Sequence, residues 1–131
     1  MENQMDPGLC RRFADLLGGH PEPRGTGCSV GIPRSLPVKV LGRPAPSTAM
    51  LEFAYEAPDA DGLALCLGEV ALLQEEVNPF ISVLARYRIP VTALHNHWLY
   101  DQPKLYYLHF AAIDRPLDFA LKVREASYHL R

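Results

Sequence analysis

The sequence of 131 residues has little cysteine and no strong excess of either charge. Its three cysteines, Cys10, Cys28 and Cys66, form no CxxC pair, so we expect buried thiols rather than a disulfide framework or a cysteine zinc knuckle. A formal net charge of −2 lacks the basic face that general binding to nucleic acid or anionic membranes requires. No apolar run approaches the roughly 20 residues of a membrane span, and the first residues lead into no signal-peptide core. We therefore expect a cytoplasmic protein that binds neither nucleic acid nor membrane.

The short motifs of common enzyme classes are also missing. The chain contains no GxSxG, no P-loop, no GxGxxG and no HExxH, which excludes the usual signatures of serine hydrolases, nucleotide-binding proteins and zincins. The literal text His95-Asn96-His97 is not the HNH nuclease signature, whose ligands and base are scattered along a ββα unit. The acidic balance of the chain also argues against a nuclease.

What is present is typical of one α+β domain spanning residues 1–131. We expect an N-terminal helix within residues 1–19, a Pro- and Gly-rich arm over 20–48, and a ββαββα core over 49–131. The fold class we predict is a mixed or antiparallel sheet with helices packed mainly on one of its faces, and with a histidine-bearing β-hairpin near the C-terminus.

Local signals place most of these elements. Asp6-Pro7 indicates a helix start and Gly18-Gly19 its end, and residues 28–32 and 38–41 indicate two short strands that form a small hairpin or an arm over the main sheet. Residues 49–56 and 63–72 indicate a strand hairpin. For the helix over 74–88, either Pro79 falls in the first turn or Asn78 caps a later start. We expect Asp114 to cap a last helix that runs to about Leu130.

Three of the five histidines fall on the predicted hairpin over 90–112. Side chains two apart on a strand share a face, so His95 and His97 point the same way. If Trp98 faces Lys104 across the turn, Ala93 lies opposite His109, and the third imidazole joins that face. The other side of the hairpin is then apolar, filled by Leu94, Tyr106, Leu108 and Phe110.

Three imidazoles on one face predict a metal site. Three nitrogens and a water make the open tetrahedral site of catalytic zinc, so we expect His95, His97 and His109 to bind a divalent metal, zinc in particular. Glu69 or Glu76 would be the fourth ligand or would accept the second ring N–H of a histidine. If the site hydrolyses a substrate, Glu76 is our candidate for the general base. The alternative is that the three rings are ordinary hydrogen-bonding groups; His20 and His129 are expected at the surface, and Cys66 in the core.

Aromatic and polar residues around the histidines predict a ligand pocket. Trp98 and Tyr107 could wall it, Asn96 lies between the two histidines, and Arg34 could reach an anionic group. The same aromatic residues also fit a cross-strand core. The rival functions are therefore a non-catalytic small-molecule binding or sensor module, and a structural interaction domain.

The chain resembles the bacterial domain of unknown function found in the mycobacterial lipoproteins LppY and LpqO. The resemblance is strongest in the segment VTALHNH, residues 91–97, with a downstream Leu108-His109. It runs in order through most of the chain, namely Gly18-Gly19, Pro33-Arg34, Gly68-Glu69, Leu72, Glu76-Val77-Asn78, the segment 91–97, Pro103 and His109. It implies that His95, His97 and His109 belong to the signature of the family, without assigning their chemistry.

The resemblance also bears on assembly. Members of that family often carry two copies of the domain behind an export signal, whereas this chain has one copy and no such signal. The duplication, together with the surplus of apolar strand positions, predicts a homodimer. Its contact would include the histidine-bearing hairpin or the arm over 28–41.

Overall fold

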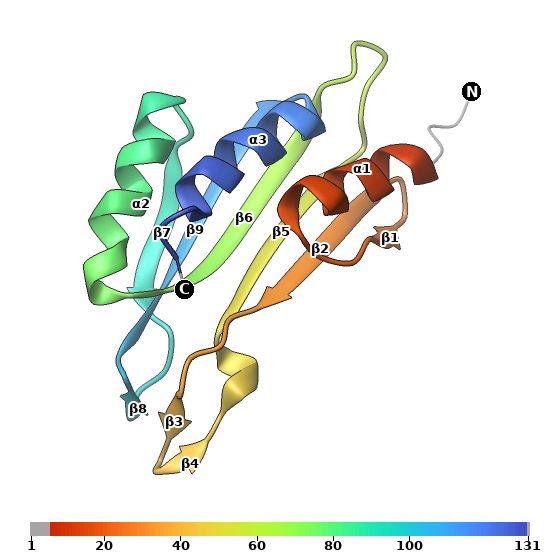
Figure 1. Ribbon diagram of the computed structural model, residues 1–131. Coiled ribbons are helices and arrows are strands. Elements are labelled where there is room, and N and C mark those ends of the chain that lie inside the picture. The colour runs from red at the N-terminus through yellow and green to blue at the C-terminus, as the bar shows by residue number, and fades with distance from the viewer. Residues whose placement is uncertain (1–5, 131) are drawn as a thin grey trace.

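The computed structural model describes residues 6–130 of the chain (Figure 1). The helices are α1 (Pro7–Leu17), α2 (Gln74–Arg86) and α3 (Pro116–Ser127), with a short 3-10 helix η1 (Pro46–Thr48). The strands are β1 (Glu22–Arg24), β2 (Gly27–Pro33), β3 (Lys39–Val40), β4 (Arg43–Pro44), β5 (Met50–Glu56), β6 (Ala64–Leu73), β7 (Val91–Asn96), β8 (Asp101–Gln102) and β9 (Leu105–Asp114).

These strands build two antiparallel sheets. The main sheet has six strands in the order β1-β2-β5-β6-β9-β7, and the smaller sheet has three in the order β4-β3-β8. All three helices lie on one face of the main sheet (Figure 1). The predicted α+β fold, with an antiparallel sheet covered on one face, is confirmed.

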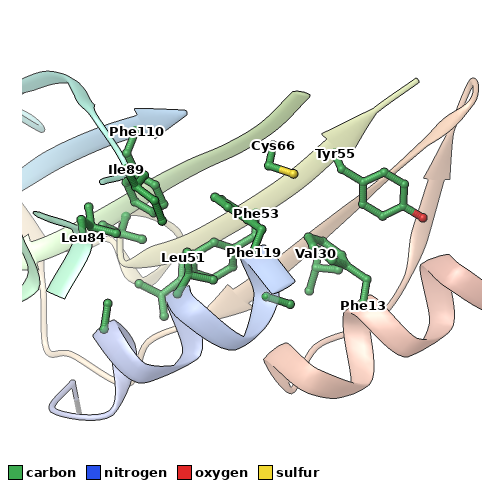
Figure 2. Close-up of a cluster of buried hydrophobic side chains, with 14 of the residues drawn as sticks. Phe13, Val30, Leu51, Phe53, Tyr55, Cys66, Leu84, Ile89, Phe110 and Phe119 are labelled. Atoms are coloured by element: carbon green, nitrogen blue, oxygen red, sulfur yellow. The ribbon is translucent and has the colours of Figure 1, made fainter. Parts of the chain in front are cut away.

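The core fills the space between the main sheet and the helices. Along β5 every second side chain is buried there, as are Leu108 and Phe110 of β9, and Phe53 and Phe110 are each about 1% exposed. Figure 2 shows these rings packed with Phe119 of α3, while Phe13 of α1 meets Tyr55 edge-on at 4.9 Å between ring centroids. The period of two in the strands therefore turns half of each strand into core and leaves the other half on the opposite face.

Helix α1 begins where the sequence predicts. The carboxylate of Asp6 accepts hydrogen bonds from the backbone N–H groups of Gly8 and Leu9, and Gly18 ends the helix in the left-handed conformation. The expectation of free thiols is wrong for two cysteines, because Cys10 of α1 and Cys28 of β2 form a disulfide. Their positions, one on a helix and one on a strand, meet only once α1 packs on the sheet. Sequence spacing alone did not reveal that contact.

Cys66 behaves as predicted. Its thiol is free and buried in the core cluster. Burial raises the pKa of this thiol to about 12, so it is protonated at neutral pH and is a poor nucleophile.

Helix α2 begins at Gln74, the first residue of the predicted range, and ends at Arg86. The two expected arrangements of its first turn are wrong, because Asn78 does not cap the helix and Pro79 lies inside it rather than in its first turn. The start is fixed by Glu76, whose carboxylate accepts the backbone N–H of Leu73 at 2.8 Å. This bond caps the helix at Leu73, six residues before Pro79. The proline lacks a backbone N–H, so the helix interior loses one hydrogen bond there.

The last helix, α3, differs from the prediction at both of its ends. Its N-cap is Arg115 rather than Asp114, and the helix ends at Ser127 rather than near Leu130. Asp114 instead accepts a hydrogen bond from the backbone of Arg115 and pairs with Lys122 at 2.7 Å. The carboxylate therefore supports the first turns of α3 without capping it.

The arm is smaller than predicted. Residues 28–32 belong to β2 of the main sheet, where Val30 pairs with Phe53, and form no hairpin with residues 38–41. Strand β3 pairs instead with β4 and with β8 of the long hairpin connection. Val38 of this region packs with Ala71 and Leu105 as a second, small core cluster.

Among residues 6–130, no helix is both long and apolar enough to cross a membrane.

Candidate functional site

The face of the main sheet opposite the helices, called here the open face, carries the polar side chains of its strands. The register places Glu52, Glu69 and His109 in one row across β5, β6 and β9, and continues it to Ala93 of β7. The predicted pairing of Ala93 with His109 is therefore confirmed. His95 lies one step along β7, opposite Tyr107.

Two of the three histidines meet on this face. Nε2 of His95 lies 3.0 Å from Nε2 of His109, and the two ring centroids are 5.0 Å apart. At its other nitrogen, His95 Nδ1 lies 2.8 Å from the backbone carbonyl of Asn96. A carbonyl oxygen can only accept, so in the neutral ring Nδ1 of His95 carries the hydrogen and its Nε2 presents a lone pair.

The lone pair on Nε2 of His95 determines what the two histidines can bind. It faces the Nε2 atom of His109 at hydrogen-bond distance. The contact is favourable when His109 donates a hydrogen to His95, or when a cation lies between two imidazole lone pairs. The geometry of the pair therefore suits a metal ion held between the two Nε2 atoms.

Glu69 lies beside His109, at the far side of its ring. Its Oε1 atom is 4.0 Å from Nδ1 of His109, beyond hydrogen-bond length. The side chain of Glu69 is 47% exposed, which leaves it free to rotate closer. A carboxylate on Nδ1 would keep the hydrogen on that nitrogen and leave Nε2 as the lone-pair atom.

His97 lies on the same face but is separated from the other two rings. It stacks on Tyr107 with 4.2 Å between centroids, whereas His95 and His109 contact Tyr107 edge-on. Burial lowers the pKa of His97, although a hydrogen bond with the backbone of Thr48 acts in the opposite direction. Within residues 6–130, no three His, Cys, Asp or Glu side chains converge closely enough to hold a metal ion.

Tyr107 organises the centre of the site. Its hydroxyl donates a hydrogen bond to Glu52 at 3.0 Å, and its ring contacts all three imidazoles. Burial, reinforced by the charge of Glu52, raises the pKa of Tyr107, so its hydroxyl stays a donor. Glu52 was not among the residues singled out from the sequence. Its place between the core residues Leu51 and Phe53 was the available signal, because it puts the carboxylate on the opposite face.

A groove continues the site across the sheet. It has a volume of about 190 Å³ and contains Glu69 and Glu52 at the end nearer the histidines. The other residues that line it are Arg24, Ser29, Phe53, Ala54 and Leu67. A ligand held at the histidine pair could extend into this groove.

Glu76 and Arg34 lie apart from the histidines and hold each other. Two guanidinium nitrogens of Arg34 contact the two carboxylate oxygens of Glu76 at 2.8 Å each. Arg34 also donates to the backbone carbonyl of Ala71, and Glu76 accepts the Leu73 N–H. The side chains are only 2% and 11% exposed, so we assign this pair a structural role.

The two remaining pocket candidates flank the site. Asn96 contributes its backbone carbonyl to His95, and it pairs with Tyr106, a residue of the helix-covered side. Trp98 is 50% exposed, and its ring centroid is 5.8 Å from that of His97. Leu94 pairs with buried Leu108 on the predicted apolar side of the hairpin, but it is 46% exposed rather than part of the core.

Comparison with known proteins gives a family and no activity. No curated protein and no solved structure matches the chain. Residues 11–129 match the family model described as Domain of Unknown Function (DUF1259). This match covers nearly the whole chain and includes every residue of the open face discussed above, so the chain belongs to the DUF1259 family of domains of unknown function.

Proposed function

We propose that the domain binds a divalent metal ion of the zinc class on its open face, through Nε2 of His95 and Nε2 of His109. The observation that carries the proposal is the separation of 3.0 Å between these two atoms. Two nitrogens at 2.0–2.1 Å from a tetrahedral zinc ion are roughly 3.3 Å apart. The rings therefore need only a small movement to take up a metal ion.

The surroundings of the pair support this proposal. The Asn96 carbonyl on Nδ1 of His95 and Glu69 near Nδ1 of His109 are the kind of partners that orient metal-bound imidazoles. Glu52, at 3.0 Å from the Tyr107 hydroxyl, adds a second carboxylate to the same face. A bound metal would supply a positive charge able to attract an anionic or carbonyl-bearing ligand.

The proposal differs from the one that the sequence suggested. His97 is not among the ligands, because the ring of Tyr107 stacks on it and lies next to the other two imidazoles. The proposal ends at binding, since both oxygens of Glu76, the expected general base, are held by Arg34. The finer likeness to the LppY and LpqO type of domain is part of this proposal, supported by the segment 91–97 that holds His95.

We also propose a cellular location for the protein. The Cys10–Cys28 disulfide supports a location in an oxidising compartment, because the reducing cytosol keeps most cysteine thiols from forming disulfides. It argues against the cytoplasmic location that we expected because the sequence has no membrane-span or signal-peptide pattern. Mass spectrometry of thiol-blocked protein from cells would test it, and a reduced Cys10–Cys28 pair would favour the cytoplasm.

Metal titration of protein purified without a histidine tag tests the proposal. We expect His95→Ala and His109→Ala each to weaken zinc binding by about tenfold or more, measured against a chromophoric chelator, because each removes a ligand. His20→Ala and His129→Ala are the controls, and they should bind as the wild type does. His97→Ala should have a smaller effect than either ligand variant. Equal affinity in all five variants, or no binding by the wild type, would refute the site.

A further inference from the structure

The two edge strands of the main sheet differ in how well they are protected. Edge strand β1 has three residues, Glu22, Pro23 and Arg24, and natural proteins use such short strands, prolines and charges to block further pairing. Edge strand β7 has six residues without proline or charge, and all of them are exposed. In the described part of the chain its only partner is β9, so the backbone groups of its outer edge have no strand to pair with.

Leu94 is the least expected residue on this edge. It points to the same side of the sheet as its buried partner Leu108, yet 46% of its surface is exposed. The bulge between Val91 and Ala93 lies before it, so Ala93 to Asn96 remain regular and can pair. An uncharged, regular edge with an exposed leucine is the pattern of a strand that has a partner.

We propose that β7 pairs antiparallel with β7 of a second copy of this chain, about a two-fold axis at Leu94. Residues opposite each other in an antiparallel pair share a face, so a continuous open face requires every second residue of one strand to meet every second residue of the other. Pairing Leu94 with Leu94 of the partner subunit meets this condition and places the contact within the regular segment Ala93 to Asn96. Ala93 then lies opposite His95 of the partner subunit. No like charges oppose each other in this register, which makes the strand complementary to itself.

The same register gives the exposed aromatic residue of the hairpin a place to bind. In an antiparallel pair the chain that follows β7 runs toward the start of β7 of the partner subunit, so Trp98 approaches the end of that strand where Pro90 lies. Pro90 borders a groove of about 320 Å³, lined also by Leu65, Arg88, Ala111, Ala112 and Ile113. Ile113 is 69% exposed, so an indole ring would cover apolar surface there, and Arg88 could lie over its face. Because ring and groove occur once in each chain, the contact forms twice, which favours a second copy over an unrelated partner.

The symmetry also limits the assembly to two chains. An isologous contact uses the same edge of both subunits, and the remaining edges are the short β1 strands with Pro23. The joined sheet therefore ends at a protected strand on each side. A closed dimer results rather than a filament.

This dimer would complete the metal site, an extension that rests on the proposed function. Ala93 has His109 opposite it on β9, and in the dimer it has His95 of the partner subunit on its other side. The small side chain of Ala93 leaves room for the two imidazoles to approach over it. A third imidazole would thus come from the second chain, which fits the finding that no three ligating side chains converge within residues 6–130.

Light scattering coupled to size exclusion tests the dimer. We expect the wild type at micromolar concentration to have twice the 14.6 kDa mass of one chain, and Leu94→Lys to have the mass of one. Leu121→Lys on α3 is the matched control, since Leu121 is 47% exposed, and it should stay dimeric. Melting curves of both variants check that the fold is kept. A wild type of single-chain mass, or a Leu94→Lys variant that stays dimeric, would overturn the proposal.

A second variant tests the register itself. Leu94→Cys should form a cross-linked dimer on mild oxidation, because opposed Cα atoms on antiparallel strands are roughly 4.5–5.5 Å apart, within disulfide reach. Leu121→Cys should stay uncross-linked. Zinc affinity of Leu94→Lys should fall by about tenfold or more if the partner supplies a ligand. A monomeric wild type that still binds zinc through His95 and His109 would refute the dimer and leave the proposed function standing.

Discussion

Strand β9 presents different chemistry to the two sides of the sheet. Leu108 and Phe110 are at most 1% exposed and pack under the helices. Tyr107 and His109, which alternate with them along the strand, lie on the open face with the other imidazoles and the carboxylates. One side of the strand therefore holds the main core together, and the other carries the site next to the small core cluster that contains Leu105. Because successive side chains alternate, the site can change without disturbing the core.

The largest expected contrast is between neighbouring residues of β9. Phe110→Ala should lower the free energy of unfolding by about 3–5 kcal/mol, because the ring packs against Phe53, Phe80 and Phe119 and its loss leaves a cavity. His109→Ala should cost less than about 1 kcal/mol, since it removes no core contact. Urea denaturation of both variants measures the difference. Similar losses for both would mean that the open face also supports the fold.

A smaller contrast separates two carboxylates. Glu76→Gln should destabilise the domain by about 3 kcal/mol, because it removes the negative charge that Glu76 places against the buried guanidinium of Arg34. Glu69→Gln, on the open face, should change stability by about 0.5 kcal/mol or less while it weakens metal binding. Chemical denaturation and zinc titration of the two variants check this division. If Glu76→Gln weakened zinc binding more than Glu69→Gln did, the structural role given to Glu76 would be wrong.

The smallest effect is expected at the exposed surface of the helix layer, where Tyr87 at the end of α2 donates a hydrogen bond to Glu125 of α3. That bond, helped by Arg86, lowers the pKa of Glu125 from its ordinary 4.5. The stability it provides is present above about pH 4.5 and is lost as the pH falls through the lowered folded-state pKa. Tyr87→Phe should therefore raise the pKa of Glu125 in an NMR titration, with Tyr128→Phe as the control. An unchanged titration would remove Tyr87 as the cause.

The sequence predicted which residues lie on the open face better than it predicted the side-chain contacts among them. Alternation in β9 and the length of the turn were sufficient to pair Ala93 with His109, because register depends on backbone spacing. They could not reveal that Tyr107 stacks on His97 and so separates it from the other two imidazoles. This depends on side-chain rotamers and on the hydrogen bond between His97 and the backbone of Thr48 in η1.

The missed features share one physical origin. Cys10 and Cys28 are 18 positions apart, and Arg34 and Glu76 are 42 apart, so both contacts exist only after the helices have packed on the sheet. The place of Pro79 in α2 was misjudged for the same reason, because Glu76, which fixes the start of the helix at Gln74, is held in place by Arg34. Local patterns describe elements, whereas these bonds form between elements.

The bond between Cys10 and Cys28 has a consequence for the unfolded chain. It closes a loop of 18 positions, and loop-closure entropy for such a length corresponds to a stabilisation on the order of 3 kcal/mol. A thiol reductant removes this contribution without touching the sheet, the histidines or the helix contacts. The melting temperature of the domain would then report the redox balance of the solution around it.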